Sequence, residues 1–233
     1  MKRGLSLLLA GVLLLSGNSC IKRRIEYEIR DGQTIAFVRI PAKDGVPAFY
    51  MQETETTIGQ VTAYDVETGD GPNYKAINSG REVDPMQPAN YMSINDMKDF
   101  CKWLSKKIKE PVSLPTLTQW QRVAFNDQKP GQTEQEYVST REGNIGREIN
   151  IWQRFLGSQY TISTRNSKRD SIGLYNLWGN LNEVVYDKKN NAYYSVGKSF
   201  GSKADDTTYS DCMSFYLDRD FPIMGFRTVI PCK

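Results

Sequence analysis

The cysteines are the residues whose type and spacing decide which chemistry this chain could perform. The sequence of 233 residues contains four of them and no histidine. Without histidine, the chain cannot build a Ser-His-Asp or Cys-His nucleophile, a histidine-ligated zinc site or a histidine proton shuttle. Any catalysis would therefore depend on thiols, carboxylates, tyrosine, basic side chains or a bound cofactor.

Three of the cysteines, Cys101, Cys212 and Cys232, lie far apart in the sequence and form no C-x-x-C pair. This spacing argues against zinc-ribbon and thioredoxin-type sites. Cys101 lies on the apolar face of an expected helix, so we interpret it as a buried core thiol. Cys212 and Cys232 are expected to form a disulfide in an oxidising compartment, worth about 3 kcal/mol of stability. The alternative is that Cys212 is a reactive thiol, which makes it the one candidate for a catalytic residue.

The fourth cysteine, Cys20, ends a segment with the layout of an export signal. Two basic residues precede an apolar stretch over residues 5–15, which is shorter than the roughly 20 apolar residues that span a bilayer. Small residues then lead into Cys20, and the segment resembles a bacterial lipoprotein signal whose cysteine carries the lipid. An ordinary signal peptide is the alternative. The resemblance implies cleavage of residues 1–19, a tether over residues 20–34, and a location in the bacterial cell envelope, at the outer membrane.

The charge of the chain is nearly balanced, with a formal net charge of +3. A nucleic-acid binder usually carries a basic stripe, so we expect no nucleic acid partner. The basic residues that follow Cys20 are Lys22, Arg23 and Arg24. We interpret them as part of a solvated tether, and attraction to anionic lipid head groups is the alternative.

Local patterns predict an α+β domain over residues 35–233. Short apolar runs predict strands at residues 35–40 and 49–51. Capping signals at Ser93 and Thr116 each precede a helical apolar pattern and predict the two main helices. Beyond residue 130, the chain is rich in Gly, Asn, Ser, Asp and Tyr, which is typical of long loops with short strands.

Six segments in order then resemble one family. They are FYMQETETTIGQ (49–60), PANYMSINDMKDFCKWLSKKIKEPVSLPTLTQWQRVA (88–124), NIWQ (150–153), GLYNLWGNLNEVVYD (173–187), GKSFG (197–201) and GFR (225–227). This series is similar to the sulfatase-modifying-factor, or formylglycine-generating-enzyme-like, domains over residues 35–231. The resemblance implies the formylglycine-generating-enzyme variant of the C-type lectin-like fold, loop-rich, with short mixed sheets and two main helices. It also implies that Trp120 and Trp178 fill the core and that Arg227 is a buried hydrogen-bonding residue.

The same resemblance indicates which chemistry this chain lacks. Enzymatic members oxidise a substrate cysteine with two cysteines of their own and thiolate-bound copper, located between the segments that match GKSFG and GFR. Here that interval contains Cys212 alone. One thiol does not make a two-thiolate Cu(I) site, so copper is not expected. Other branches hold iron through histidines, which this chain lacks. A non-catalytic protein is therefore expected, and a formylglycine-generating-type oxidoreductase acting on a sulfatase cysteine is the alternative.

Calcium is the other cofactor that the family resemblance implies. Family members bind it through the G-N-x-x-E segment, which places candidate ligands at Asn180, Leu181 (through its carbonyl) and Glu183. Oxygen ligands of this kind suit Ca²⁺. The alternative is that Asn180 and Glu183 hydrogen-bond the loop backbone.

The expected function is a binding or scaffold module: an envelope lipoprotein that holds a protein partner and reaches the membrane through its lipid anchor. The segment before GFR has the residue types of a recognition surface. The candidates are Tyr209, Asp211, Phe215, Tyr216 and Asp218. Related proteins of this fold bind ligands through a variable C-terminal segment, which is a second alternative, and an ordinary exposed loop is the third.

Overall fold

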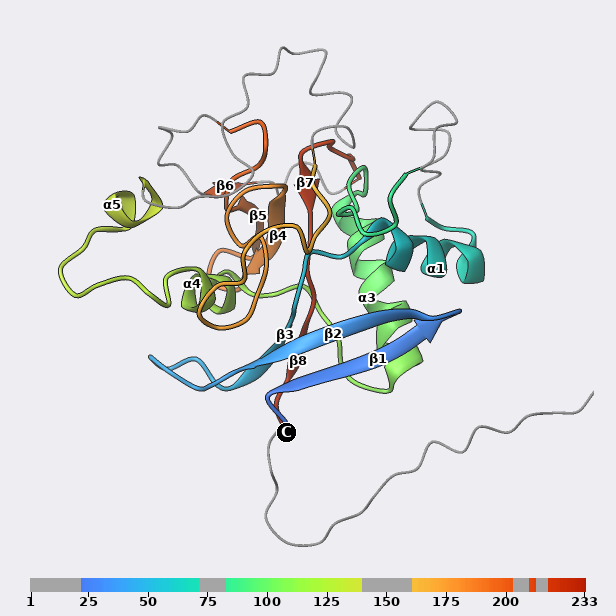
Figure 1. The fold of residues 1–233 in the computed structure, drawn as a ribbon, viewed down its shortest axis with the longest axis horizontal. Coiled ribbons are helices and arrows are strands. Elements are labelled where there is room, and N and C mark those ends of the chain that lie inside the picture. The colour runs from blue at the N-terminus through green and yellow to red at the C-terminus, as the bar shows by residue number, and fades with distance from the viewer. Residues whose placement is uncertain (1–21, 72–82, 140–160, 203–209, 213–217) are drawn as a thin grey trace, which may run out of the picture.

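The computed structural model describes residues 22–71, 83–139, 161–202, 210–212 and 218–233. These residues form two four-stranded sheets and four helices (Figure 1). The α+β class predicted from the sequence is confirmed.

The first sheet contains both ends of the described chain. Its strands, in spatial order, are β1 (Arg24–Arg30), β2 (Gln33–Ile40), β3 (Phe49–Gln52) and β8 (Val229–Pro231). All neighbouring strands are antiparallel. Asp31 and Gly32 connect β1 to β2 with φ angles of 45° and 81°. An Asp-Gly pair adopts this left-handed backbone readily, which explains the tight hairpin.

The tether predicted over residues 20–34 is wrong from Arg24 onward, because β1 begins there. In β1, apolar side chains alternate with charged ones, and Ile25, Tyr27 and Ile29 pack against the core. Such an alternation is typical of a strand with one buried face. The high charge of the other face concealed this pattern in the sequence.

The second sheet is mixed, as predicted. Its strands, in spatial order, are β6 (Ser210–Cys212), β5 (Ala192–Val196), β4 (Asn182–Asp187) and β7 (Met224–Gly225). β4 pairs parallel with β7, whereas β5 is antiparallel to both of its neighbours. The segment between β7 and β8 carries the chain from the second sheet into the first.

Three of the four described helices begin with a capping box. They are α1 (Ile58–Thr68), α3 (Ile94–Ile108) and α4 (Leu117–Ala124), capped by Thr57, Ser93 and Thr116 respectively. The fourth is α5 (Glu134–Ser139). The two helices predicted from the sequence, α3 and α4, are confirmed, and α1 and α5 are additional. No helix in the described part of the chain is both long and apolar enough to cross a membrane.

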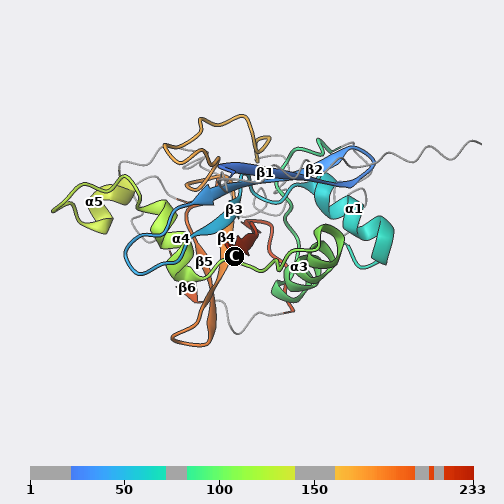
Figure 2. The same ribbon diagram turned by 90° about the horizontal axis from the view of Figure 1, so that it is seen from below.

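Two apolar clusters form the core on either side of the central strands. One cluster gathers α1 and α3 with Phe37 and Phe226, and the other gathers α4 with Trp120, Trp178 and β3. Figures 1 and 2 show α3 and α4 on opposite sides of β3 and β8, with the β1–β2 hairpin lying along one side of the molecule. The expected core roles of Trp120 and Trp178 are confirmed, since their exposed fractions are 0% and 8%.

Candidate functional site

A buried ion pair links the two sheets. Glu183 on β4 and Arg227, just after β7, are 1% and 0% exposed. The Arg227 Nε donates to Glu183 Oε1 (2.7 Å), and Trp120 Nε1 donates to Glu183 Oε2 (2.9 Å). Arg227 also donates to the backbone carbonyl of Gln52 on β3 (3.2 Å). Arg227 is therefore the buried hydrogen-bonding residue that the sequence predicted.

A second buried carboxylate, Glu55, lies beside this pair. Its Oε2 accepts from the side-chain amides of Asn176 (3.0 Å) and Asn180 (2.8 Å), and its Oε1 accepts from the Leu181 backbone amide (3.1 Å). Burial and the nearby charge of Glu183 raise the pKa of Glu55 to about 8, against the amide donors and Arg227, which favour the carboxylate. The raised pKa favours the protonated form of Glu55 at neutral pH.

The positions of Asn180 and Glu183 follow from the turn that precedes β4. Gly179 and Asn180 have φ angles of 92° and 67°, a left-handed conformation that glycine and asparagine tolerate best. This turn directs Asn180 inward. We call Glu55, Asn176, Asn180, Glu183 and Arg227 the buried polar cluster. Because their side chains are buried and bonded to one another, they connect the loops and the two sheets and are not accessible to a substrate.

Asn180 and Glu183, two of the three residues predicted to bind calcium, belong to this cluster, and their side-chain oxygens already accept hydrogen bonds; the third, Leu181, donates its backbone amide to Glu55 Oε1 (3.1 Å). Asn180 Oδ1 accepts from the Ile162 amide (3.0 Å), and both oxygens of Glu183 accept from Arg227 and Trp120. Ca²⁺ takes six to eight oxygen ligands, waters included. The calcium site stays a prediction, and it would require these oxygens to bind the ion beside or in place of their present donors.

A second charged cluster surrounds Glu53, whose side chain is 2% exposed. Arg24 and Arg169 donate to its carboxylate, and Arg165 lies 3.6 Å from Oε2. The Arg169 guanidinium also stacks over the Tyr175 ring at 5.0 Å. Three half-exposed guanidinium groups around one carboxylate leave an excess of positive charge on this side of the molecule.

The cysteines do not form the disulfide that the sequence predicted. Cys232 follows β8 in the first sheet and has a free thiol, whereas Cys212 ends β6, an edge strand of the second sheet. Figure 1 shows β6 beside β5, apart from the C-terminus, which lies below β8. The free thiol of Cys232 contradicts the predicted Cys212–Cys232 bridge.

Cys101 is the buried core thiol that the sequence predicted. It is 4% exposed on the inner face of α3, and burial raises the pKa of its thiol far above the ordinary value. A thiol in this environment is inert, because the thiolate is the reactive form. Cys20, the predicted lipidation residue, lies outside the described residues.

Most of the predicted recognition surface also lies outside the described residues, namely Tyr209, Phe215 and Tyr216. The backbone of Asp211 pairs with Ser195 in the second sheet. Asp218 is exposed, and its carboxylate accepts from the Asn95 side-chain amide at the start of α3 (2.5 Å).

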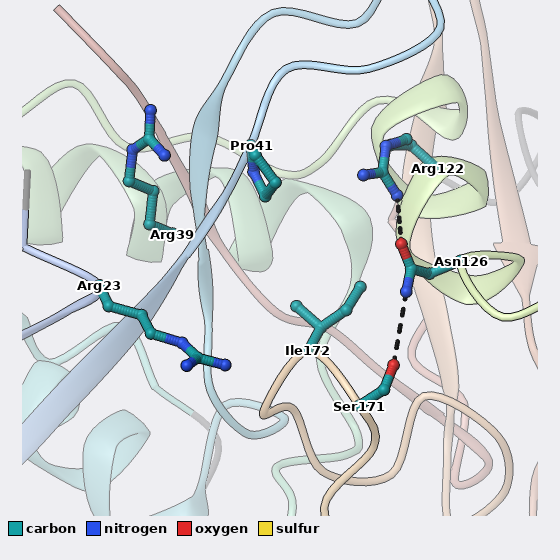
Figure 3. A pocket seen from close by; sticks show the side chains of 7 residues that line it. All are labelled: Arg23, Arg39, Pro41, Arg122, Asn126, Ser171 and Ile172. Carbon is teal, nitrogen blue, oxygen red and sulfur yellow. Dashed lines mark hydrogen bonds between the residues drawn. The ribbon is translucent and has the colours of Figure 1, made fainter.

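A pocket lined by three arginines was not anticipated from the sequence. It has a volume of about 380 Å³ and is lined by Arg23, Arg39, Pro41, Arg122, Asn126, Ser171 and Ile172. Figure 3 shows that Arg23 and Arg122 approach it from opposite sides. These arginines come from the start of the described chain, from β2 and from α4. No sequence motif links them, because only the fold brings them together.

Comparison with known proteins gives a family match and a number of structural relatives, three of which are described below. A family model described as a sulfatase-modifying factor enzyme 1-like domain matches residues 9–232. No curated protein matches the sequence. PvdO from Pseudomonas aeruginosa is similar in structure, with a TM-score of 0.59 and 15% identity, over 86% of this chain and 84% of that chain. CarF has a TM-score of 0.60 and 19% identity, over 82% of this chain and 89% of that chain. Treponema denticola variable protein 1 has a TM-score of 0.64 and 15% identity, over 90% of this chain and 99% of that chain. At these identities, the structural matches establish a shared fold.

Proposed function

Because the chain belongs to the sulfatase-modifying factor enzyme 1-like family, we propose that it uses the family fold as a non-catalytic binding or scaffold module of the bacterial cell envelope. In this proposal, a lipid on Cys20 anchors the protein at the outer membrane, and the folded domain holds a protein partner. The proposal does not include a formylglycine-generating reaction.

The observation that carries the non-catalytic role is the separation of the thiols. Copper-dependent oxidation of a substrate cysteine by two protein thiolates requires both sulfur atoms at one metal ion. In the described part of the chain, Cys101 is buried in the core and Cys232 lies on the other sheet from Cys212. This arrangement supports a Cys212 that has no second thiolate beside it at a metal ion.

The buried polar cluster supports the same reading. Glu183 and Arg227 come from the two motifs that most resemble the family, GLYNLWGNLNEVVYD and GFR. The two side chains bond to each other, and Arg227 also bonds to the backbone of β3, so both connect the two sheets. These motifs therefore account for the fold, and they supply no accessible acid or base for catalysis.

The position of β1 supports a membrane-anchored arrangement. β1 begins at Arg24, only four residues after Cys20. Four extended residues span at most about 14 Å, so a lipid on Cys20 would hold the first sheet close to the membrane surface. The exposed Lys22 and Arg23 would then lie near anionic head groups, each worth about 1 kcal/mol.

A ligand-binding protein with a variable recognition segment is a second candidate. It is favoured by the similarity to Treponema denticola variable protein 1, of which 99% is covered. The corresponding surface here would be the segment that ends at Asp218. In both candidates the fold acts by binding rather than by catalysis.

The non-catalytic role is tested by Cu(I) titration of the purified protein and by incubation with a sulfatase-motif peptide containing its substrate cysteine. We expect neither stoichiometric Cu(I) binding nor oxidation of the peptide cysteine. Cys212→Ser and the matched control Cys232→Ser should behave like the unmodified chain. One equivalent of bound Cu(I) that is lost in Cys212→Ser but kept in Cys232→Ser, together with peptide oxidation, would refute the proposal.

The anchoring is tested separately by fractionation of cells that express the unmodified chain or Cys20→Ala. We expect the unmodified chain in the outer-membrane fraction, with incorporation of labelled fatty acid, and the variant without label. Equal fractionation of both forms without labelling would refute the lipid anchor and leave the binding role open.

A further inference from the structure

We propose that the charged cluster around Glu53 is the surface on which this protein holds an acidic segment of its protein partner. The residues that would contact the partner are Arg165 and Arg169, both in the loop that precedes β4. This inference rests on the proposed binding role, to which it adds a place on the fold and the chemistry of the partner. The surface is separate from the buried polar cluster and from the recognition segment predicted from the sequence.

The first argument is that the guanidinium groups of this cluster converge. Arg24 and Arg165 each place an Nη2 atom beside Oε2 of Glu53, at 3.1 and 3.6 Å. Arg169 Nη2 donates to the other oxygen, Oε1. Three positive charges thus meet at one carboxylate, and the Glu53 side chain beneath them is only 2% exposed. An anion that approaches this point from solvent would meet more than one guanidinium group.

The second argument is that the fold needs fewer arginines than it places here. Glu53 accepts hydrogen bonds from Arg24 and Arg169, which already exceed the single positive charge that balances one carboxylate. Arg165 lies at ion-pair distance but donates no hydrogen bond to any residue that the structure describes. Like charges this close repel one another, so a third arginine adds little to stability. Even with Glu26, which pairs with Arg24, three arginines against two glutamates leave a net charge of +1.

The third argument is that the surplus donors face solvent. The side chains of Arg165 and Arg169 are 49% and 50% exposed. A guanidinium group carries five N–H donors, and among the described residues Glu53 accepts one from Arg169 and none from Arg165. The remaining donors can bind a partner's carboxylate, which guanidinium recognises through paired, charge-assisted hydrogen bonds.

The fourth argument is that the fold holds this loop in place without a partner. The backbone amide of Tyr175 donates to the carbonyl of Glu53 (3.0 Å), which ties the loop to the end of β3. The Arg169 guanidinium stacks over the Tyr175 ring, 5.0 Å from its centroid. Next to Arg165, the backbone amide of Thr164 donates to a carbonyl of the segment between α1 and α3 (2.8 Å). The positive groups are therefore positioned before any partner binds.

The open shape and mixed charge of the cluster favour a protein as the partner. Small ligands bind in clefts that enclose most of their surface, whereas Arg165 and Arg169 are half exposed. A bilayer attracts uniformly basic surfaces, whereas Glu26, which is 39% exposed, adds an acidic group beside Arg24. A protein segment can present a carboxylate to Arg165 and Arg169 and avoid Glu26. Arginine and tyrosine are enriched at the hot spots of protein interfaces, and Tyr175 lies against Arg169.

The test uses the purified full chain carrying Cys20→Ser, so that no acyl chain is attached, and hexaglutamate as the probe. Binding is measured by calorimetry at about 50 mM salt, with hexaglutamine as the uncharged probe. We expect hexaglutamate to bind at one site and hexaglutamine not to bind. Arg165→Gln should weaken binding at least about threefold, and the double variant Arg165→Gln/Arg169→Gln at least about tenfold. Arg165→Lys keeps the charge but loses the paired geometry, so its loss should be smaller than that of Arg165→Gln.

The matched control is Arg30→Gln, which removes an arginine at the other end of β1, where it pairs with acidic residues of its own. It should change the affinity by less than about twofold, because exposed charges beyond a Debye length are screened. Arg165→Gln should not lower the unfolding temperature, whereas Arg169→Gln should lower it, because only Arg169 donates to the buried carboxylate. An equal fall in both variants would show that Arg165 is a structural partner of Glu53, and it would overturn the proposal.

The other outcomes assign the cluster to a different occupant or to none. If N-acetylglutamate binds as tightly as hexaglutamate, the cluster is a site for small anions and the proposal is overturned. Failure of hexaglutamate to bind, or an equal loss of affinity in Arg30→Gln, also overturns it. In that case, Arg165-dependent sedimentation with phosphatidylglycerol vesicles would assign the cluster to a lipid surface. None of these results bears on Cu(I) binding or on fatty-acid labelling, so a failure here is distinguishable from a failure of the proposed function.

Discussion

The buried polar cluster predicts a specific failure of additivity when its two carboxylates are changed together. Glu183→Gln removes the charge that balances Arg227, which is fully buried. Breaking a buried ion pair by neutralising one partner destabilises a protein by about 3–5 kcal/mol. In this protein Glu55 can compensate, because the Glu183 charge is one of the causes that raise its pKa. In Glu183→Gln the pKa of Glu55 should fall, and its carboxylate should then balance Arg227.

The magnitudes follow from the charge of the cluster near pH 7. Glu55→Gln replaces a mostly protonated acid and leaves the Glu183–Arg227 pair intact, so it should destabilise the fold by about 1–2 kcal/mol through imperfect amide contacts. Glu183→Gln should cost about 3 kcal/mol. The double variant leaves Arg227 with no carboxylate, so its loss should exceed the sum of the single losses by about 1–3 kcal/mol.

The assay is urea unfolding at pH 7, followed by tryptophan fluorescence, since Trp120 contacts Glu183 directly. Asp99→Asn is the control, because its pair with Lys102 is exposed and should contribute no more than about 0.5 kcal/mol. Losses that add to within about 0.5 kcal/mol in the double variant would refute the idea that Glu55 and Glu183 share the charge of Arg227.

Three further predictions concern the same region. The pKa of Glu55 is raised in the fold, so its contribution to stability is fully present below about pH 4.5 and is lost as the pH rises through about 8. The free energy of unfolding of the unmodified chain should therefore fall between pH 5 and 8.5, and this fall should be missing in Glu55→Gln. Equal dependence on pH in the two proteins would contradict the prediction. Gly225→Ala should destabilise the fold by about 1–3 kcal/mol, because the added Cβ would lie 2.8 Å from the Leu181 side chain and 3.0 Å from a backbone carbonyl. The control Gly45→Ala, whose Cβ would contact nothing, should destabilise it by only about 1 kcal/mol. Similar losses for the two variants in urea unfolding would argue against a steric role for Gly225. Chelation of calcium should leave the unfolding temperature unchanged, because the Glu183 oxygens are occupied, and a calcium-dependent rise that Glu183→Gln abolishes would instead support the predicted site.

The sequence predicted those parts of the fold that local patterns determine. The helices α3 and α4 begin at Ser93 and Thr116 as expected, since a capping box is a local signal. The same signal is present at the start of α1, in Thr57 and Gln60, but an internal glycine and a short apolar pattern concealed it. The burial of Arg227 was predicted through the family resemblance rather than through any local pattern.

The features that the sequence did not predict depend on long-range placement. Cys212 and Cys232 are 20 residues apart, yet they lie in different sheets, because the chain crosses from β7 to β8 between them. Arg23, Arg39 and Arg122 line one pocket although they come from three distant segments. Neither the separation of the cysteines nor the meeting of the arginines leaves a trace in spacing or composition. Only the register of the strands and the path of the loops determine them.

The order of the strands along the chain determines when the first sheet can form during synthesis. β8 is its last strand along the chain, and Arg227, just before β8, is 175 residues after Gln52 on β3. Until these residues emerge, Glu183 lacks its counter-charge and β3 lacks its second neighbour, so the native core cannot close. Folding of the first sheet then waits until Arg227 and β8 have been made, because the contacts that complete this sheet join residues distant in sequence.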